Sequence, residues 1–185
     1  TGGYGGKGFY KIILALLEAR YEPPVIRKPE LWIQSKLEGT FYKGLTYNVT
    51  ALVGNAGNQD ASGVRVDFVD NGVRVGSCTI PLLRSGETTT VVFNWTPMTV
   101  GSHTLQLLID PENRIQETNE TNNKIVLNVI VNQPLPDLIC KGTELAVDFI
   151  VNETYTFTAR ISNIGPANAS GVRVDFVDNG VRVGS

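Results

Sequence analysis

The stretch ASGVRVDFVDNGVRVGS occupies residues 61–77, and the same seventeen letters return at residues 169–185. Each copy contains the dipeptide Asn-Gly between two runs in which apolar and polar residues alternate. Asn-Gly in this setting is a strong signal for a two-residue type I′ hairpin, because both central residues must take positive φ. The sequence therefore predicts one hairpin with strands over 64–69 and 73–80, and a second hairpin spelled with the same letters.

The length of the turn also predicts which residues of the first hairpin face each other. A two-residue loop would pair Val69 with Arg74 and Phe68 with Val75. Five apolar side chains would then share one buried face: Val64, Val66, Phe68, Val73 and Val75. Arg65, Asp67 and Arg74 would lie on a solvated face, where a charge pair contributes about 0–1 kcal/mol.

The repeat extends well beyond its identical part. At a separation of 108 residues, several upstream positions recur, namely Thr46, Tyr47, Thr50, Ala51, Asn55 and Gly57. With one residue inserted, Pro-Glu-Leu at 29–31 matches Pro-Asp-Leu at 136–138. The unit is longer than a solenoid repeat of about 20–50 residues. We predict a complete module over 29–132 and a truncated second copy over 133–185.

Apolar residues recur with a period of two through most of the unit, which is typical of half-buried strands. Seven strands are predicted, at 31–36, 45–53, 64–69, 73–80, 88–95, 103–109 and 124–131. Short strands at this spacing, with no helix between them, favour an all-β fold: a seven-stranded antiparallel immunoglobulin-like β-sandwich. The Cys-Trp-Cys spacing of true immunoglobulin domains is absent from the sequence.

The order of motifs resembles the CARDB module, the cell-adhesion-related domain found in bacteria and archaea. The resemblance covers residues 29–132 and is carried by LTYNVTALVGNAG, VDFVDNGVRVGS, the strand end Phe93–Pro97 and the loop 110–123. Residues 136–185 resemble the first half of a second module. The resemblance implies an extracellular protein of the cell surface, in which tandem sandwiches act as spacers or adhesion modules without a shared catalytic site.

Residues 1–28 lie outside the predicted sandwich. An apolar stripe at helical spacing predicts a short helix that ends before Pro23-Pro24, and its residues are Phe9, Ile12, Ile13, Leu16 and Leu17. Residues 1–20 weakly resemble the end of an α/α-toroid repeat of the prenyltransferase or terpene-cyclase type. We expect either the tail of a preceding helical domain followed by a proline-rich linker, or a helix that caps the sandwich.

Composition argues against several classes of function. The net charge is −2, and no run of Lys and Arg exceeds two residues, so we expect no nucleic-acid partner. The longest apolar run has six residues, against about 20 for a membrane-spanning helix, so we expect no membrane insertion. His103 is the one histidine, and we expect it in the core or at its rim.

The two cysteines, Cys78 and Cys140, occupy unlike positions in their modules, so neither a disulfide between them nor a zinc site is expected. Cys140 aligns with Ile33, which predicts that its side chain is buried.

The loop DPENRIQETNETNN, residues 110–123, collects side-chain oxygens of the kind that calcium prefers. The candidate ligands are Asp110, Glu112, Asn113, Glu117, Asn119 and Glu120. The spacing differs from that of an EF-hand and lacks its glycine. We favour the alternative of a strand connection in which Asx side chains bond to the loop backbone and Ile115 turns toward the core. Apart from this candidate calcium site, the sequence predicts no cofactor.

Five Asn-X-Ser/Thr sequons are present, where about two would arise by chance. They begin at Asn48, Asn94, Asn119, Asn152 and Asn168, all on predicted outward faces or loops. They predict either N-glycosylation or simply polar decoration of exposed β faces. The leading functional hypothesis is a non-catalytic surface spacer that meets neighbouring repeats, other surface proteins or glycans. The alternative is an accessory region of a secreted enzyme whose catalytic domain lies upstream.

Overall fold

A computed structural model describes residues 25–142 and 148–184 of the chain. These residues form twelve strands, which are β1 (Leu31–Ser35), β2 (Phe41–Tyr42), β3 (Tyr47–Asn55), β4 (Ala61–Asp70), β5 (Val73–Leu83), β6 (Thr88–Trp95), β7 (Gly101–Ile109), β8 (Lys124–Asn132), β9 (Leu138–Gly142), β10 (Ala159–Asn163), β11 (Phe176–Asp178) and β12 (Val181–Gly184). No helix able to cross a membrane occurs in the described ranges. The predicted N-terminal helix and the toroid resemblance lie outside the described residues.

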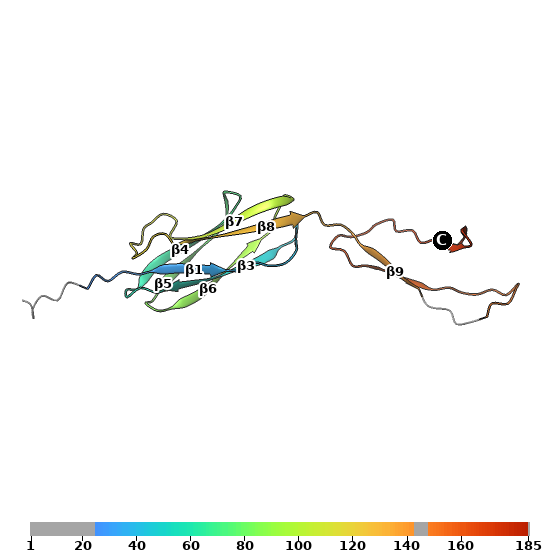
Figure 1. Ribbon diagram of the computed structural model, residues 1–185, viewed down its shortest axis with the longest axis horizontal. Helices are drawn as coiled ribbons and strands as arrows, with labels where there is room; N and C mark the ends of the chain where they lie inside the picture. The colour runs from blue at the N-terminus through green and yellow to red at the C-terminus, as the bar shows by residue number, and fades with distance from the viewer. Residues whose placement is uncertain (1–24, 143–147, 185) are drawn as a thin grey trace, which may run out of the picture.

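Strands β1–β8 form a two-layer sandwich, as predicted. One layer is the sheet β1-β3-β6, and the other is the sheet β2-β8-β7-β4-β5. Figure 1 shows β1, β3 and β6 in one layer and β7 and β8 in the other. All seven predicted strands are present, and their neighbours within each sheet are antiparallel. The two-residue β2, which pairs in parallel with β8, is too short for a period-two pattern to predict.

The core lies between the two layers and consists of the side chains that the period of two points inward. Its largest fully buried members are Trp95, Phe68, Leu31, Leu83, Leu105, Leu107 and Ile109. Trp95 packs edge-on against Phe41, and Phe68 stacks on Phe93 with the ring centroids 5.6 Å apart. Burial of each large apolar side chain contributes about 1.5–3 kcal/mol to the free energy of folding.

The first hairpin has the predicted turn but a different register. Asn71 (φ 47°) and Gly72 (φ 82°) both take positive φ, and Val69 pairs with Arg74 as predicted. A β-bulge then pairs Phe68 with Gly76, so the predicted partner Val75 is wrong.

The bulge also corrects the predicted inner face of the hairpin. It displaces Val75, which is 46% exposed, while Val73 lies next to the turn and is 65% exposed. Gly76 takes the inner position, because a Cβ there would lie 2.8 Å from Phe93. Of the five apolar residues assigned to this face, only Val64, Val66 and Phe68 are buried.

The charged face of the hairpin is less solvated than predicted. Asp67 is only 6% exposed, because Arg65 binds its carboxylate with two hydrogen bonds of 2.9 Å and Ser77 Oγ donates a third at 2.6 Å. Arg74 lies 3.7 Å from the same carboxylate. Burial raises the pKa of Asp67, but the hydrogen bonds and the arginine charges outweigh it, so the net pKa is lowered.

The described residues after β8, 133–142 and 148–184, form two small separate sheets. β9 pairs with β10, as β1 does with β3, and β11 pairs with β12, as β4 does with β5. Cys140 lies in β9 and is exposed, so its predicted burial is wrong. The reason is that, in the described ranges, β9 belongs to a two-stranded sheet in which β10 is its only partner. Both cysteines are free thiols, with Cys78 half-buried. The module boundaries at residues 28/29 and 132/133 stay a prediction.

Candidate functional site

The acidic loop, residues 110–123, is shaped first by Asp110. This residue takes φ 42°, its backbone N–H donates to the Arg65 carbonyl at 2.8 Å, and its Oδ2 accepts from Ile115 N–H at 2.6 Å. Ile115 packs against the core, as the strand-connection interpretation predicts. Asp110 therefore holds the loop backbone in place.

Glu117 is the most deeply buried acidic residue of the loop, with 3% of its surface exposed. Its Oε2 accepts from Leu31 N–H at 2.6 Å, and its Oε1 accepts from Asn123 Nδ2 at 2.8 Å. Burial raises the pKa of Glu117 to about 7; the two hydrogen bonds oppose this, while the charges of Glu120 and Glu30 add to it. At neutral pH the carboxyl is therefore divided between its acid and ionised forms.

The loop is tied to the segment through which the chain enters the sandwich. Glu30 accepts hydrogen bonds from Thr118 Oγ1 and, at 2.7 Å, from Asn122 Nδ2. Lys28 Nζ donates to the Glu117 carbonyl at 3.3 Å. The sequence pattern missed the role of Glu30, because 88 residues separate it from Thr118.

The six candidate calcium ligands do not converge on one point. Glu112 pairs with Arg65 and Arg114, and Asn119 Oδ1 accepts two hydrogen bonds from Thr121. Glu120 Oε1 accepts from Glu117 N–H at 2.8 Å, and Asn113 N–H donates to the Asp110 carbonyl. Across residues 25–142 and 148–184, no group of three or more His, Cys, Asp or Glu is arranged to hold a metal ion.

Two oxygens of the loop are nevertheless buried without a hydrogen-bond partner, Asn122 Oδ1 and Asn123 Oδ1. A buried acceptor without a partner is costly, by about 1–3 kcal/mol. Asn123 also lines a cleft of about 420 Å³ together with Asp110, Asn113 and Glu120.

A second constellation, which we call the linker clamp, holds the incoming chain against the loop after β3. Asn55 is 1% exposed, and its Oδ1 accepts from Glu30 N–H and from Gly57 N–H, both at 3.0 Å. Its Nδ2 donates to the carbonyls of Gln59 and Leu83. Gly57 has no room for a side chain, since a Cβ would lie 2.4 Å from the Lys28 carbonyl oxygen.

The same clamp is present in the second repeat. Asn163 Oδ1 accepts from Asp137 N–H and from Gly165 N–H at 3.0 Å, and its Nδ2 donates to the Ala167 carbonyl. A Cβ on Gly165 would lie 2.4 Å from Asp137 N. The recurrence of Asn-X-Gly and Pro-Glu/Asp-Leu, visible in the sequence, is therefore the signature of a clamp on the linker.

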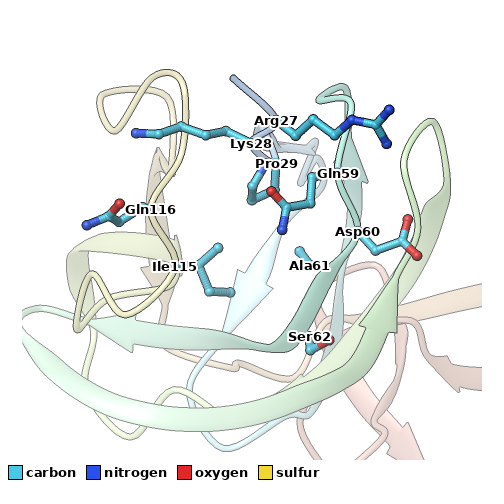
Figure 2. A pocket seen from close by; sticks show the side chains of 9 residues that line it. All are labelled: Arg27, Lys28, Pro29, Gln59, Asp60, Ala61, Ser62, Ile115 and Gln116. Carbon is cyan, nitrogen blue, oxygen red and sulfur yellow. The ribbon is translucent and has the colours of Figure 1, made fainter. Parts of the chain in front are cut away.

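Beside the first clamp lies an open cleft of about 290 Å³. Figure 2 shows that Arg27 and Lys28 extend to opposite sides of it, while Ile115 and Ala61 lie across from them. Its polar side chains do not converge on a common point in this view. The cleft is a surface hollow next to the linker, and it presents no pairing of nucleophile and base.

His103 is 3% exposed and lies in the core, which is one of the two positions that the sequence predicts for it. Its Nδ1 lies 2.8 Å from Asp70 Oδ1, and its Nε2 lies 3.1 Å from Thr99 Oγ1. Asp70 also accepts from Trp95 Nε1 at 3.0 Å. This network satisfies the polar groups of a large buried tryptophan and joins the turn at Thr99 to the end of β4.

All five sequon asparagines are exposed: Asn48, Asn94, Asn119, Asn152 and Asn168. Asn48 and Asn94 are direct cross-strand partners on the outer face of β3 and β6. Asn152 takes φ 72°. The structure therefore leaves every sequon accessible but gives them different backbone settings.

A family model described as CARDB matches residues 28–126 and 135–185. The chain belongs to the CARDB family. Both matched segments contain a linker clamp, so the clamp is a feature that the two CARDB segments of this chain share. CARDB is a family of non-catalytic domains. No curated protein matches the chain.

Two solved CARDB-like structures are similar to the chain. One is the crystal structure of a CARDB domain from Pyrococcus furiosus, described as a complex with di-metal ions; it is 26% identical, with a TM-score of 0.54, and the match covers 58% of this chain and 97% of that one. The other is a solution structure of residues 272–376 of a protein named as a cell surface protein of Methanosarcina acetivorans. It is 31% identical, with a TM-score of 0.48, and the match covers 57% of this chain and 93% of that one.

Proposed function

We propose that this chain is part of a non-catalytic spacer or adhesion region of an extracellular, multi-domain prokaryotic cell-surface protein. In this role each sandwich holds position between its neighbours, and contacts with other surface proteins or glycans are made by exposed faces and loops. The alternative is an accessory region of a secreted enzyme, with the catalytic domain upstream.

The linker clamp is the observation that carries this proposal. Asn55 and Asn163 each fix the backbone of the residue that follows a linker proline, with the same two acceptor bonds of 3.0 Å. A linker that is hydrogen-bonded to its module has fewer conformations than a free one, and so transmits position along the chain. Neither clamp contains groups suited to proton transfer or nucleophilic attack.

The surface location is supported by the relative from M. acetivorans, which is named as a cell surface protein. The test is antibody labelling of intact and permeabilised cells of the source organism, with an antibody raised against residues 29–132. We expect equal labelling in both samples, while a cytoplasmic marker is labelled only after permeabilisation. Labelling of this protein only in permeabilised cells would exclude a surface role.

Cation binding by the acidic loop is a second candidate function. It is supported by the unpartnered oxygens of Asn122 and Asn123, and by the metal ions in the CARDB structure from P. furiosus. Of the six residues expected from the sequence, the proposal retains Glu117 and Glu120. A divalent cation there would offset the repulsion between the carboxylates of Glu117 and Glu120. It would also supply a partner for the side-chain oxygens of Asn122 and Asn123.

Calorimetric titration with calcium, together with melting in calcium and in chelator, tests this second function. We expect heat of binding and a higher melting temperature in calcium. Glu120→Gln should weaken both effects. Glu112→Gln, in the same loop but paired with Arg114, is the matched control and should leave them unchanged. The absence of heat and of any melting shift would remove the cation from the proposal.

A further inference from the structure

The sequon in the acidic loop has a geometry that distinguishes it from the others. Thr121 Oγ1 donates to Asn119 Oδ1 at 2.7 Å, and Thr121 N–H donates to the same oxygen at 3.0 Å. Both residues are exposed. Asn119 Nδ2 makes no hydrogen bond within the ranges that the structure covers, so it is presented to solvent.

This arrangement favours reaction at the amide nitrogen. A carboxamide nitrogen is a weak nucleophile, because its lone pair is delocalised into the carbonyl. Donors already aimed at the carbonyl oxygen stabilise the negative charge that develops there as the nitrogen loses its proton. In the Asn119 sequon both donors come from Thr121 of the same tripeptide and are in place before any enzyme binds.

The two strand sequons lack this geometry. Asn48 and Asn94 lie opposite each other in the ladder of β3 and β6. In a strand, residues i and i+2 are separated by about 6.6 Å, so the hydroxyl cannot reach the amide without loss of ladder hydrogen bonds. Thr96 Oγ1 instead bonds to Thr46 Oγ1 at 2.8 Å. These sequons would have to leave the sheet before they could adopt the Asn119 geometry.

The sequons of the second repeat, at Asn152 and Asn168, lie outside the strands. Among the described residues, neither asparagine accepts a hydrogen bond from the hydroxyl two positions later. The internal hydroxyl-to-amide bond is therefore specific to Asn119 among the five sequons described.

We propose that Asn119 is the preferred acceptor of an N-linked glycan on the folded module. Asn119 Nδ2 forms a bond to C1 of the first sugar, and the bond from C1 to a lipid-linked diphosphate breaks. The diphosphate leaves with the bonding electron pair, and the amide proton passes to a base of the transferase. The donor class is a lipid-linked oligosaccharide, and in the organism the reaction depends on the export proposed above.

The position of Asn119 gives the glycan a structural consequence. The neighbouring Thr118 donates its backbone N–H to the Pro29 carbonyl at 3.2 Å, and its hydroxyl to Glu30. A glycan on Asn119 therefore stands next to the clamped linker. Such a glycan would hinder access of proteases to the chain just before β1.

The test uses the purified, folded 185-residue chain with an oligosaccharyltransferase and a lipid-linked oligosaccharide donor, read by intact mass and by glycopeptide mapping. We expect one glycan per chain, located on Asn119. Asn119→Gln and Thr121→Val should lose it, while Thr121→Ser should retain it. The reaction is performed in vitro, so its outcome does not depend on whether the protein is exported. A failure of the glycan proposal can therefore be distinguished from a failure of the surface role, which the cell-labelling experiment tests.

Matched controls keep the outcome interpretable. Asn113→Gln, an exposed asparagine of the same loop outside any sequon, should not change the mass added. The double variant Asn48→Gln, Asn94→Gln should not change it either. Tryptophan fluorescence would verify that each variant is folded. Transfer to Asn48 or Asn94 in preference to Asn119, or no transfer to the folded chain, would overturn the proposal.

Discussion

The same seventeen letters occur twice in this chain, and the turn and the ion pair that they encode have nearly the same geometry in both copies. The turn residues are Asn71 at φ 47° and Gly72 at φ 82° in the first copy, against 46° and 83° in the second. In the first copy Arg65 Nε lies 2.9 Å from Asp67 Oδ1, and in the second Arg173 Nε lies 2.8 Å from Asp175 Oδ1. Both hairpins carry the bulge next to the phenylalanine.

Burial, by contrast, differs completely between the copies. Val64 is fully buried, whereas its counterpart Val172 is 45% exposed. The pairing of β4 with β5 extends over ten residues of β4, but β11 has only three. In the first copy β7 pairs with β4 and Phe93 of β6 packs on Phe68, whereas among the described residues no further strand pairs with β11 or β12. Identical letters therefore determine the turn and the ion pair, while burial depends on distant strands.

The largest effect is expected in amide hydrogen exchange. Amides of Val64–Phe68 should exchange about 1000-fold more slowly than those of Val172–Phe176, because exchange in a core strand requires global unfolding. Since peptides within 61–77 and 169–185 have the same mass, the measurement needs peptides that begin upstream, where Asp60 and Asn168 differ. Equal protection in the two copies would show that the second hairpin is covered as well as the first.

Phe68→Ala and Phe176→Ala form a matched pair with a large expected difference. Phe68 is fully buried and stacked on Phe93, so its truncation should cost about 3–5 kcal/mol of unfolding free energy. Phe176→Ala should leave the same transition unchanged. Trp32 and Trp95 are the two tryptophans of the chain and both lie in the first sandwich, so denaturation followed by tryptophan fluorescence reports on that sandwich. A similar loss in both variants would mean that the two repeats unfold as one unit.

These pairs also mark what the sequence could and could not predict. Period-two alternation and Asn-Gly were enough for seven strands and the turn, because both signals are local. The bulge recurs in the second hairpin without a further strand of the described ranges packed on Gly184, so it does not depend on Phe93; it was missed because a period of two cannot show an extra residue in one strand. The burial of Asp67 was missed because Arg65, two positions away on the same face, covers it.

At the candidate site, the pattern placed Ile115 and the Asx connection correctly but gave no indication of Glu30. Its bonds to Thr118 and Asn122 join segments about ninety residues apart, and no periodicity reports on such contacts. Asn55 and Gly57 were visible as recurring letters, yet their role required the clamp geometry.

Asn55→Ala and Asn163→Ala compare the two clamps. Asn55→Ala leaves the buried Leu83 carbonyl and the part-buried Glu30 N–H without their partner, so a loss of about 2–3 kcal/mol is expected. Asn163 is exposed, and water can replace its bonds, so the corresponding loss should be below about 1 kcal/mol. Urea denaturation followed by circular dichroism and tryptophan fluorescence measures both. Equal losses would indicate that the second clamp is as well shielded from water as the first.

The smallest expected effect concerns the aspartates of the two hairpins. The pKa of Asp67 is lowered in the folded chain, so the folded state binds fewer protons than the unfolded state in the acid range. Its contribution to stability is therefore complete above the ordinary pKa of about 4, and is lost as the pH falls through the lowered value. Asp67→Asn should thus reduce the urea midpoint at pH 7, and this reduction should become smaller as the pH is lowered below about 4. Asp175→Asn, in the exposed copy, should leave the midpoint of the first sandwich unchanged throughout this range. A pH-independent loss in Asp67→Asn would show that its hydrogen bonds, and not its charge, stabilise the outer face of β4.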